Sequence, residues 1–428
     1  MLTPQFPAVN IPSLQKVDLP AVARIRLKQP SAPAIADIEA GVRQALEGAD
    51  RLKALAAGSR VALAVGSRGI AHIDRLARAV VGWLREQRLE PFIVPAMGSH
   101  GGGTAEGQAA VLARLGVDEQ RTGAPVRATM EVVECGRTAK GVPCFFDANA
   151  HAADAVVIIG RVKSHTSFDR PIESGLTKMV GIGLGKQEGA RNIHRMGPYG
   201  LSEVLPEMAS VAIANSPLAY GLAIVENAAH EIVTIEGAEP AAFADTDIRL
   251  LKKAKSLLAR LPVRKLDVLA CQELGKEVSG AGMDYAVIGR TDIRGIANPD
   301  HIEMVKLVVL RLTEATHGNG IGIGVADYVP KTLTDGLDLK SMYENAITSA
   351  LGEKCRIPIV LPSERETLQA AFATCWNTDP ASWRYCQIRN TLSLDEVLVS
   401  RPVMEELGAD GTLEPLEFDD EGRLLTIL

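Results

Sequence analysis

The alternation of short apolar runs with helix-like patterns constrains the fold of this chain more than any other feature of its sequence. Four apolar runs predict buried strands, at residues 61–65, 92–97, 155–160 and 222–225. Helical spacing of apolar residues separates the first three runs, at residues 70–85 and 104–115, and Thr104 is the expected N-cap of the second helix. Apolar strands that alternate with helices are typical of a parallel sheet covered on both faces, so we expect an α/β fold.

The pattern starts again in the second half of the chain. Residues 247–261 form a charged, amphipathic stretch typical of a helix, which Pro262 ends. Beyond it, strands are predicted at residues 266–271, 320–328 and 357–361, and a helix at residues 301–316. With 428 residues the chain is long enough for two domains. We predict two α/β domains with mainly parallel sheets, at residues 1–262 and 263–428, with an active site in the cleft between them.

Charge and composition argue against several classes of function. The formal net charge is −6 and the pI is about 5.9, whereas a nucleic-acid partner needs a basic surface. No apolar stretch approaches the roughly 20 residues of a membrane helix, and the first residues do not resemble a signal peptide. The six cysteines include no C-x-x-C pair, which would indicate a zinc ribbon or a redox motif. We expect a soluble, cytoplasmic protein.

Polar turns follow three of the predicted strands. Ser67 and Arg68 follow the first strand in Gly-Ser-Arg-Gly, His100 follows the second in Gly-Ser-His-Gly, and His165 follows the third in Lys-Ser-His-Thr. Ligands of open α/β sheets bind beyond the carboxyl ends of the strands, so three polar turns indicate a site there. Any one of these turns alone is better explained as an ordinary loop. The glycine-rich turn after His100 matches neither a dinucleotide fingerprint nor a P-loop.

Residues 165–195 contain the densest set of polar groups. They include His165, His194, several lysines and arginines and five glycines, and we expect a long functional loop with a short helix near Lys178. A loop of solvated lysines is the alternative. Because histidine titrates near neutral pH, His100 and His165 together suggest an acid–base pair that removes a proton from one face of a substrate and returns it to the other.

The ordered set Arg68, His100, His165, Lys178 and His194 resembles the nickel-dependent lactate racemases and their homologues. In that family one strand-end turn carries an Arg, a second carries Gly-x-His and a third carries a His. A Ser-Gly-x-x-Lys segment follows, with a further His sixteen residues after the Lys. Here Lys178 ends the segment Ser-Gly-Leu-Thr-Lys, and His194 lies sixteen positions later. The resemblance covers most of the chain, is strongest at residues 61–195, and in the second half is to a shorter, divergent branch of the homologues.

The resemblance implies a cofactor and roles for these residues. It implies a nickel-pincer nucleotide (nickel pyridinium-3,5-bisthiocarboxylic acid mononucleotide) bound covalently at Lys178, with His194 as a nickel ligand. His100 and His165 are then the alternating acid and base, and Ser67 and Arg68 contact the cofactor. Under this hypothesis the first domain binds the cofactor and carries out catalysis, the second contributes substrate contacts, and the enzymes that make the cofactor are partners.

The sequence departs from the family at two places. Val65 stands where the first turn of the family usually has an Asp, and Ser67 is a candidate replacement. The interval from His165 to Lys178 is longer than in the lactate enzymes, with the extra residues at 169–172. We therefore expect a substrate other than lactate.

A 2-hydroxy acid needs a cation for its carboxylate. Arg68, Lys276 and Arg290 are candidates, although the last two are equally consistent with surface charges. Trp376 is a weaker candidate for a wall of the site, because a tryptophan is more often part of a core.

We predict an isomerase, namely a racemase or epimerase that inverts C2 of a 2-hydroxy acid. One alternative at the same site is an oxidoreductase that releases the keto acid, and another is a non-catalytic binder of a sugar acid or of the cofactor. The two histidines count against the binder, because binding alone needs no acid–base pair. No H-E-x-x-H or comparable cluster supports a zinc hydrolase.

Overall fold

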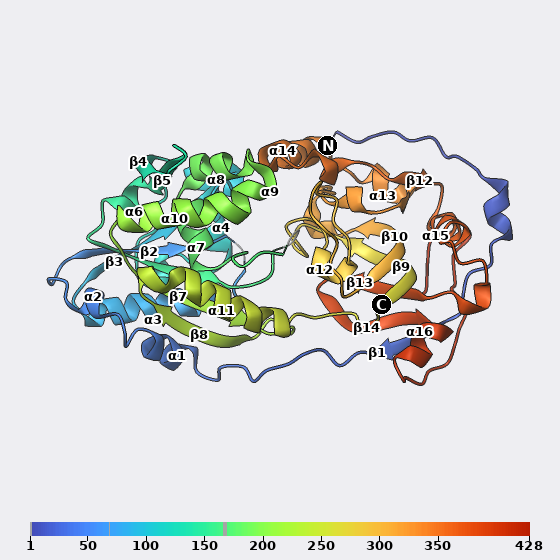
Figure 1. Ribbon diagram of the computed structural model, residues 1–428, viewed down its shortest axis with the longest axis horizontal. Helices are drawn as coiled ribbons and strands as arrows, with labels where there is room; N and C mark the ends of the chain where they lie inside the picture. Colours follow the sequence, from blue (N-terminus) through green and yellow to red (C-terminus); the bar gives the residue numbers. More distant parts are fainter. Residues whose placement is uncertain (1, 68, 166–168) are drawn as a thin grey trace. The chain divides into compact units, whose positions relative to one another are not determined.

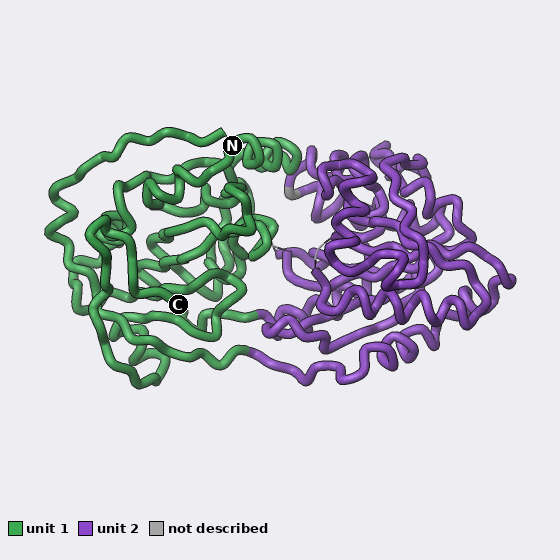
Figure 2. The backbone as a smooth tube through the Cα atoms, turned by 180° about the vertical axis from the view of Figure 1, so that it is seen from behind, with its two compact units in different colours: residues 1–29, 166–168, 259–428 green, residues 30–165, 169–258 purple. Residues whose placement is uncertain are grey.

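The structure, a computed structural model, describes residues 2–67, 69–165 and 169–428. This part of the chain divides into two compact units (Figure 2). Unit 1 contains residues 2–29 and 259–428, and unit 2 contains residues 30–165 and 169–258. Ser67, His100, His165, Lys178 and His194 all belong to unit 2, whereas Arg68 lies outside the described residues.

Within its described residues, unit 2 is built on a five-stranded sheet with the strand order β3-β2-β6-β7-β8. Its strands are β2 (Arg60–Val65), β3 (Glu90–Pro95), β6 (Ala155–Arg161), β7 (Leu218–Glu226) and β8 (Ile232–Ala238). Neighbouring strands from β3 to β7 are parallel, and β8 is antiparallel to β7. The four apolar runs predicted as strands in the first half of the chain are therefore confirmed, in one mainly parallel sheet.

Helices cover both faces of this sheet, because successive residues of its strands point to opposite sides and both sets are apolar (Figure 1). Val61, Leu63 and Val65 pack in the cluster that contains α1 (Ile38–Ala45) and α3 (Ile73–Glu86). Ala62 and Ala64 pack in the cluster that contains α10 (Leu205–Ala214) and α11 (Phe243–Ser256). The doubly covered sheet predicted from the sequence is confirmed.

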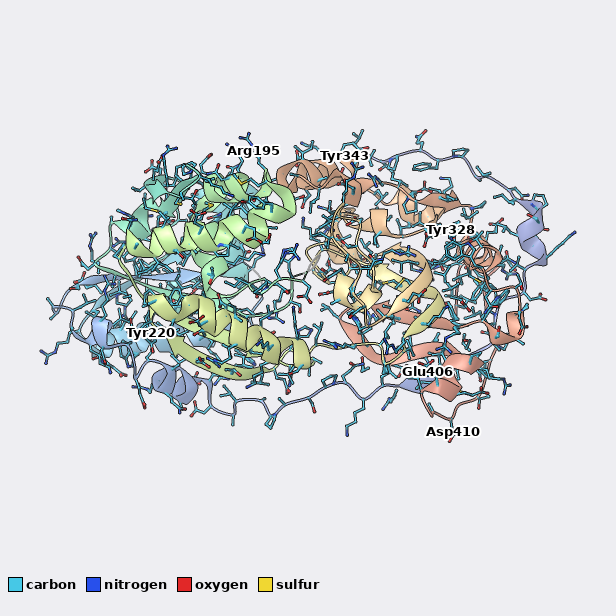
Figure 3. The ribbon with its side chains drawn as sticks, in the orientation of Figure 1. Arg195, Tyr220, Tyr328, Tyr343, Glu406 and Asp410 are labelled. Carbon is cyan, nitrogen blue, oxygen red and sulfur yellow. The ribbon has the colours of Figure 1, made fainter. Side chains whose placement is uncertain are left out.

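Shorter elements complete unit 2. They are α2 (Asp50–Lys53), η2 (Gly101–Gly103), α4 (Ala105–Arg114), α5 (Glu119–Thr122), β4 (Val132–Arg137), β5 (Pro143–Asp147), α6 (Ala148–His151), α7 (Leu176–Lys178), η3 (Met179–Gly183), α8 (Lys186–His194), α9 (Gly197–Tyr199), η4 (Gly200–Val204) and η5 (Pro240–Ala242). The Thr104 hydroxyl accepts the N–H of Gly107 at 3.1 Å, which confirms the predicted N-cap of α4. Tyr220, labelled in Figure 3, is buried and donates its hydroxyl to the Ala45 carbonyl at 3.0 Å.

Unit 1 contains a seven-stranded sheet among its described residues, with the order β1-β14-β13-β9-β10-β11-β12. Its strands are β1 (Val22–Arg26), β9 (Lys265–Leu274), β10 (Glu303–Leu312), β11 (Tyr328–Pro330), β12 (Ile359–Leu361), β13 (Tyr385–Asn390) and β14 (Ser393–Ser400). The five strands from β13 to β12 are parallel, and β14 runs antiparallel to both β13 and β1. The expectation of a second mainly parallel α/β unit is confirmed.

Helices pack on both faces of this second sheet as well. One apolar cluster contains residues of α12 (Tyr285–Ile288), α13 (Lys331–Asp335), α14 (Leu339–Ser349) and α16 (Arg401–Glu406). The other contains residues of η1 (Pro12–Lys16) and α15 (Glu364–Ala373). Short turns of 3-10 helix lie at η6 (Glu314–Thr316), η7 (Ile323–Val325), η8 (Gly352–Cys355) and η9 (Pro380–Ser382).

The division of the chain differs from the predicted domains 1–262 and 263–428. Residues 2–29 belong to unit 1, because β1 pairs with β14 over five residue pairs, from Val22↔Ser400 to Arg26↔Glu396. The change from unit 2 to unit 1 falls after Leu258, four residues before Pro262. A single apolar strand gives no sign of which distant partner it will join, and this pairing was therefore not predictable from the pattern.

Two predicted elements of the second half are wrong. Residues 301–316 were predicted as a helix, but they contain β10, whose residues Leu307 and Val309 face one cluster and Val308 and Leu310 the other. A strand buried on both faces has no alternation, so its apolar positions can mimic helical spacing. Residues 320–328 were predicted as a strand, but they form turns and η7 before β11, since Gly322 has a φ of 95°.

In the part of the chain that the structure describes, no helix has both the length and the apolar character needed to cross a bilayer.

Candidate active site

The three predicted polar turns lie at one edge of the unit 2 sheet. β3, β2 and β6 are neighbours and run in the same direction, so the segments after their last residues leave the sheet at the same end. Ser67 follows β2, His100 follows β3, and His165 follows β6. The prediction that these turns share one sheet edge is confirmed.

Ser67 and His100 are in direct contact. The Ser67 hydroxyl oxygen lies 2.5 Å from Nδ1 of His100. A hydroxyl both donates and accepts, so this hydrogen bond can persist whether or not Nδ1 carries the proton. Through this contact, Ser67 orients the ring of His100.

The Lys178–His194 segment packs against the turn that carries His100. The Gly98 N–H donates to the Gly183 carbonyl at 3.2 Å, and Gly98 has a φ of 58°. A Cβ at Gly98 would lie 3.2 Å from Ile182, closer than a side chain is normally accommodated. Glycine at this position therefore allows the two backbones to meet.

Lys178 lies at the end of a helical turn that a distant carboxylate caps. The two oxygens of Asp247, on α11, accept the N–H groups of Leu176 and Thr177 at 2.9 and 2.8 Å. Gly175 precedes this turn with a φ of 91°, and a Cβ there would overlap the Asp247 carboxylate. The Ser-Gly-x-x-Lys segment thus needs its glycine because the cap approaches from that side.

His165 is held through its backbone. Its N–H donates to the Glu173 carboxylate at 2.6 Å, and Lys255 of α11 pairs with the other oxygen of Glu173 at 2.6 Å. Ser174 closes the same loop, since its hydroxyl accepts the Lys163 N–H at 2.7 Å and donates to the Lys163 carbonyl at 2.6 Å. Asp169, in the stretch 169–172 where we expect extra residues relative to the lactate enzymes, is tied to this support through its ion pair with Lys255 at 2.8 Å.

The segment from Leu176 to His194 is mostly helical, which differs from the predicted long loop. α7, η3 and α8 follow one another, and η3 is a π-helical turn in which Leu184 N–H donates to the Met179 carbonyl at 2.8 Å. Such turns are frequent at functional sites. His194 ends α8 and is followed by Arg195, which Figure 3 labels.

His194 is unprotonated at neutral pH. Burial of the imidazole, and secondarily the positive charge of Lys178, lower the pKa of His194 to about 4. The positive charge of Lys178 thus helps to keep the imidazole of His194 neutral.

Arg161 and Glu226 join the same edge of the sheet. The Arg161 guanidinium pairs with Glu226, the last residue of β7, at 2.8 Å and donates to the Gly69 carbonyl at 3.0 Å. Glu226 also accepts the Ala71 N–H at 2.8 Å. This pair fixes the turn that follows Ser67, and Arg161 Nε is a buried donor without a hydrogen-bond partner among the described residues.

Three further candidates belong to unit 1. The Lys276 N–H donates to Thr316 at 3.2 Å, and Arg290 pairs with Asp327 at 2.6 Å and donates to the carbonyls of Val305 and Val325. The Arg290 guanidinium therefore supports the packing of unit 1. Trp376 is 84% exposed, in contrast to the usual core position of a tryptophan, and Lys306 lies 5.3 Å from its ring centre.

Several supporting residues were missed by the sequence analysis. Asp247, Glu173, Asp147 and Lys186 are buried charged residues next to the turns, and all but Glu173 act on segments far away in the sequence. The alternative prediction for residues 165–195, a loop of solvated lysines, is wrong for Lys186, whose side chain is fully buried. Within the described residues, no group of three or more His, Cys, Asp or Glu side chains is arranged to hold a metal ion.

Part of the sequence matches a known family, and the fold is similar to a solved structure. Residues 13–199 match the lactate racemase N-terminal domain family. This range includes every unit 2 candidate named above except Glu226, Asp247 and Lys255. The fold is similar to that of the lactate racemase apoprotein from Thermoanaerobacterium thermosaccharolyticum, with a TM-score of 0.52 and 12% identity over 87% of this chain and 99% of that one. No curated protein sequence matches this chain.

Proposed function

Because residues 13–199 match the lactate racemase N-terminal domain family, we propose that this chain is a racemase or epimerase that inverts C2 of a 2-hydroxy acid. The observation that carries the proposal is the Ser67–His100 contact in a turn whose backbone is hydrogen-bonded to the segment that carries Lys178 and His194. Two acid–base histidines at strand ends on the same edge of one sheet suit an inversion, in which a proton must leave and return.

The described residues fit a tethered nickel-pincer nucleotide. A histidine must be neutral to bind a metal, and His194 meets this condition from about pH 4 upwards. Lys178 is the amine that would hold the cofactor covalently. The cofactor brings its own sulfur and carbon donors, so a single protein imidazole can complete the metal site. When bound, this group supplies a reversible acceptor for the hydride of C2.

His100 is assigned to the hydroxyl proton of the substrate. With Nδ1 engaged by Ser67, the ring nitrogen that exchanges the proton is Nε2. The Ser67 hydroxyl can donate to Nδ1 or accept from it, so the ring keeps its orientation in both protonation states. His165 has the complementary role on the other face of the substrate, and Glu173 holds its backbone.

The substrate carboxylate requires a cation. Arg161, with one buried donor at the sheet edge, joins Arg68 and Lys276 as a candidate, whereas the guanidinium of Arg290 is occupied by Asp327 and backbone carbonyls. We propose that residues 169–172 help to determine which substrate binds. Asp169 pairs with Lys255, and Lys255 also pairs with Glu173, which holds the backbone of His165.

The proposal is tested by producing the protein together with cofactor-synthesis enzymes, which we propose as its partners, and mapping the peptide that contains Lys178 by mass spectrometry. We expect a nucleotide adduct on Lys178 and one nickel per chain. Lys178→Ala loses both, and His194→Ala keeps the adduct but loses nickel. His100→Ala and His165→Ala keep both and lose inversion, whereas His72→Asn, at an exposed histidine of unit 2, behaves like the unchanged protein.

An unmodified Lys178 from cells that load a known lactate racemase would contradict the proposal. Release of a 2-oxo acid in place of the inverted product would assign the site to an oxidoreductase. The substrate is then found by screening 2-hydroxy acids for loss of optical purity.

A further inference from the structure

A fully buried ion pair lies beneath the candidate site. The Lys186 ammonium lies 2.9 Å from Asp147, and neither side chain is exposed to solvent. Burial raises the pKa of Asp147 and lowers the pKa of Lys186, which reflects how unfavourable an unpaired charge would be there. Lysine is almost never completely buried, so this position needs an explanation.

The ammonium also reaches the turn that carries His100. Lys186 Nζ donates to the carbonyl of Pro95, the last residue of β3, at 2.5 Å, and to the side-chain oxygen of Gln108 at 3.0 Å. The amide nitrogen of Gln108, which is itself fully buried, donates to the carbonyls of Gly98 and His100 at 2.8 and 3.3 Å. Lys186 and Gln108 thus bind both ends of the Pro95–His100 segment.

The same lysine begins the helix that carries His194. Lys186 is the first residue of α8 and His194 is the last. Lys186 has a φ of 52°, a left-handed conformation that is uncommon for a residue with a side chain and that persists only where surrounding contacts enforce it. One residue therefore joins the start of α8 to the His100 turn.

We infer that Lys186, Asp147 and Gln108 are positioning residues, which hold the His100 turn in register with the helix that ends at His194. The inference rests on the proposed function for the roles of His100 and His194, but the contacts themselves belong to the chain. None of the three residues is assigned to touch substrate or cofactor.

An apolar cluster would not serve this purpose equally well. Replacing a buried ion pair with apolar residues of similar volume is often neutral or stabilising, so stability alone does not account for the pair. Beside its ion pair with Asp147, the ammonium donates directed hydrogen bonds to Pro95 and Gln108, which an apolar side chain cannot do. Directed bonds fix the geometry of a turn in a way that apolar contacts do not.

Two variants separate positioning from packing. Gln108→Met keeps the volume and the Lys186–Asp147 ion pair but removes the bonds to the Gly98 and His100 carbonyls, together with the bond that Gln108 accepts from Lys186. The double variant Lys186→Met with Asp147→Asn removes both charges together, and the amide oxygen preserves the cap of Asp147 on the Ala150 N–H. The matched control is the double variant Lys354→Met with Asp292→Asn, at an almost buried Lys–Asp pair of unit 1.

The first readout is the ¹⁵N NMR signal of His100 in the unloaded chain, assigned among the eight histidines by its absence in His100→Gln. In the unchanged protein we expect a tautomer ratio that differs from that of an exposed histidine, because the ring is held in one orientation by its surroundings, including the Ser67 hydroxyl, which accommodates either tautomer. In Gln108→Met, and in the Lys186/Asp147 double variant, we expect the signal to move towards the tautomer mixture of the exposed His72. The control leaves the His100 signal unchanged.

The second readout is turnover of the loaded enzyme, in which both variants lower kcat by about 10–100-fold and change KM by less than about threefold. A His100 signal that is unchanged in a folded Gln108→Met overturns the inference. This variant decides the matter even if the double variant does not fold, as checked by circular dichroism. Because the NMR readout needs neither cofactor nor substrate, a failure of the proposed racemase activity is distinguishable from a failure of this inference.

Discussion

At the scale of single residues, the neutral imidazole of His194 is the most informative feature of the site. Its pKa of about 4 has two causes, burial first and the positive charge of Lys178 second. The two causes can be separated experimentally, because replacing Lys178 removes its charge but leaves most of the burial of His194 unchanged. Each leads to a different prediction.

Removing the charge of Lys178 should raise the pKa of His194. In Lys178→Met we expect the value to increase from about 4 but to remain below the ordinary 6.5, because burial is the larger cause and is unchanged. NMR titration of His194 in the unloaded protein measures the shift. Lys252→Met, at an exposed lysine of α11, is the control and should leave the titration as it was. An unchanged His194 pKa in Lys178→Met would show that the two side chains do not interact.

His194 should also make the stability of the protein depend on pH. The unfolded chain binds a proton at His194 below about pH 6.5, whereas the folded chain does so only below about pH 4, so stability increases with pH across this window. We expect the contribution of His194 to fall by about 2 kcal/mol between pH 7 and pH 5. His194→Gln removes this contribution, and urea unfolding at the two pH values measures the difference between variant and unchanged protein. Equal pH dependence in both proteins would contradict the assignment.

The sequence indicates the candidate site residues but not the residues that support them. Arg68, His100, His165, Lys178 and His194 form an ordered series with recognisable spacing. Asp247 and Lys186 have no such series, because their partners lie far away in the chain and an isolated Asp or Lys is most often a surface residue. Their roles depend on burial, which only the folded arrangement reveals.

At the scale of elements, the short helix α7 depends on a cap from another helix. A helix of three residues cannot satisfy its own first N–H groups, and Asp247 of α11 accepts two of them. Burial raises the pKa of Asp247 to about 6, so the carboxylate is ionised at neutral pH. The position of Lys178 thus depends on a residue of α11.

Asp247→Ala should therefore destabilise unit 2 and loosen Lys178. We expect a loss of about 1–3 kcal/mol at pH 7, because the N–H groups of Leu176 and Thr177 become buried without an acceptor. Asp245→Ala, at an exposed carboxylate of the same helix, should cost less than about 1 kcal/mol. Urea unfolding gives the stability, and a faster reaction of Lys178 with an acylating reagent would report its greater freedom. A loss no larger than that of the control would mean that the cap is dispensable.

The elements of unit 2 were predicted more accurately than those of unit 1. Strands β2, β3 and β6 are short apolar runs between clear helical patterns, and each ends at glycine or polar residues. β10 lacks such clear boundaries in the sequence. Its central Leu-Val-Val-Leu is apolar at every position, so it fits the spacing of a helix as well as that of a strand. The helical segment from Leu176 to His194 was obscured by its glycines, which lower helix propensity but allow the close contacts with neighbouring backbones.

At the scale of the whole molecule, each unit has its own sheet and its own apolar clusters, but the chain does not pass through them in order. Residues 2–29 contribute to unit 1 through the β1–β14 pairing, the packing of Leu14 near α15 and the bond from Gln369 to the Val17 carbonyl at 3.1 Å. Unit 2 consists of residues 30–165 and 169–258 within the described chain. We therefore expect unit 2 to fold without the rest of the chain, whereas unit 1 needs two separate segments of the chain to complete its sheet.

The stability of isolated fragments of the chain should show this difference between the units. Residues 30–258 alone are expected to unfold in one cooperative transition and to retain the low pKa of His194. Residues 259–428 alone lack β1, which leaves β14 as an unpaired edge prone to association. Addition of a peptide of residues 2–29 should raise the unfolding midpoint of the second fragment, as measured by circular dichroism, whereas a peptide with Ile25→Pro should not. Equal stability with and without the intact peptide would contradict this role of β1.

The pairing of β1 with β14 also has a consequence during synthesis. β1 leaves the ribosome before any part of unit 2, but its partner is complete only when Ser400 has been translated. At about 5–20 residues per second, the nascent chain carries β1 without its partner for tens of seconds, while unit 2 can already fold. The segment Val-Ala-Arg-Ile-Arg has two arginines on the exposed side of the strand, at Arg24 and Arg26. We expect the repulsion between these positive charges to disfavour pairing of the unpaired β1 with the β1 of another nascent chain on the same polysome.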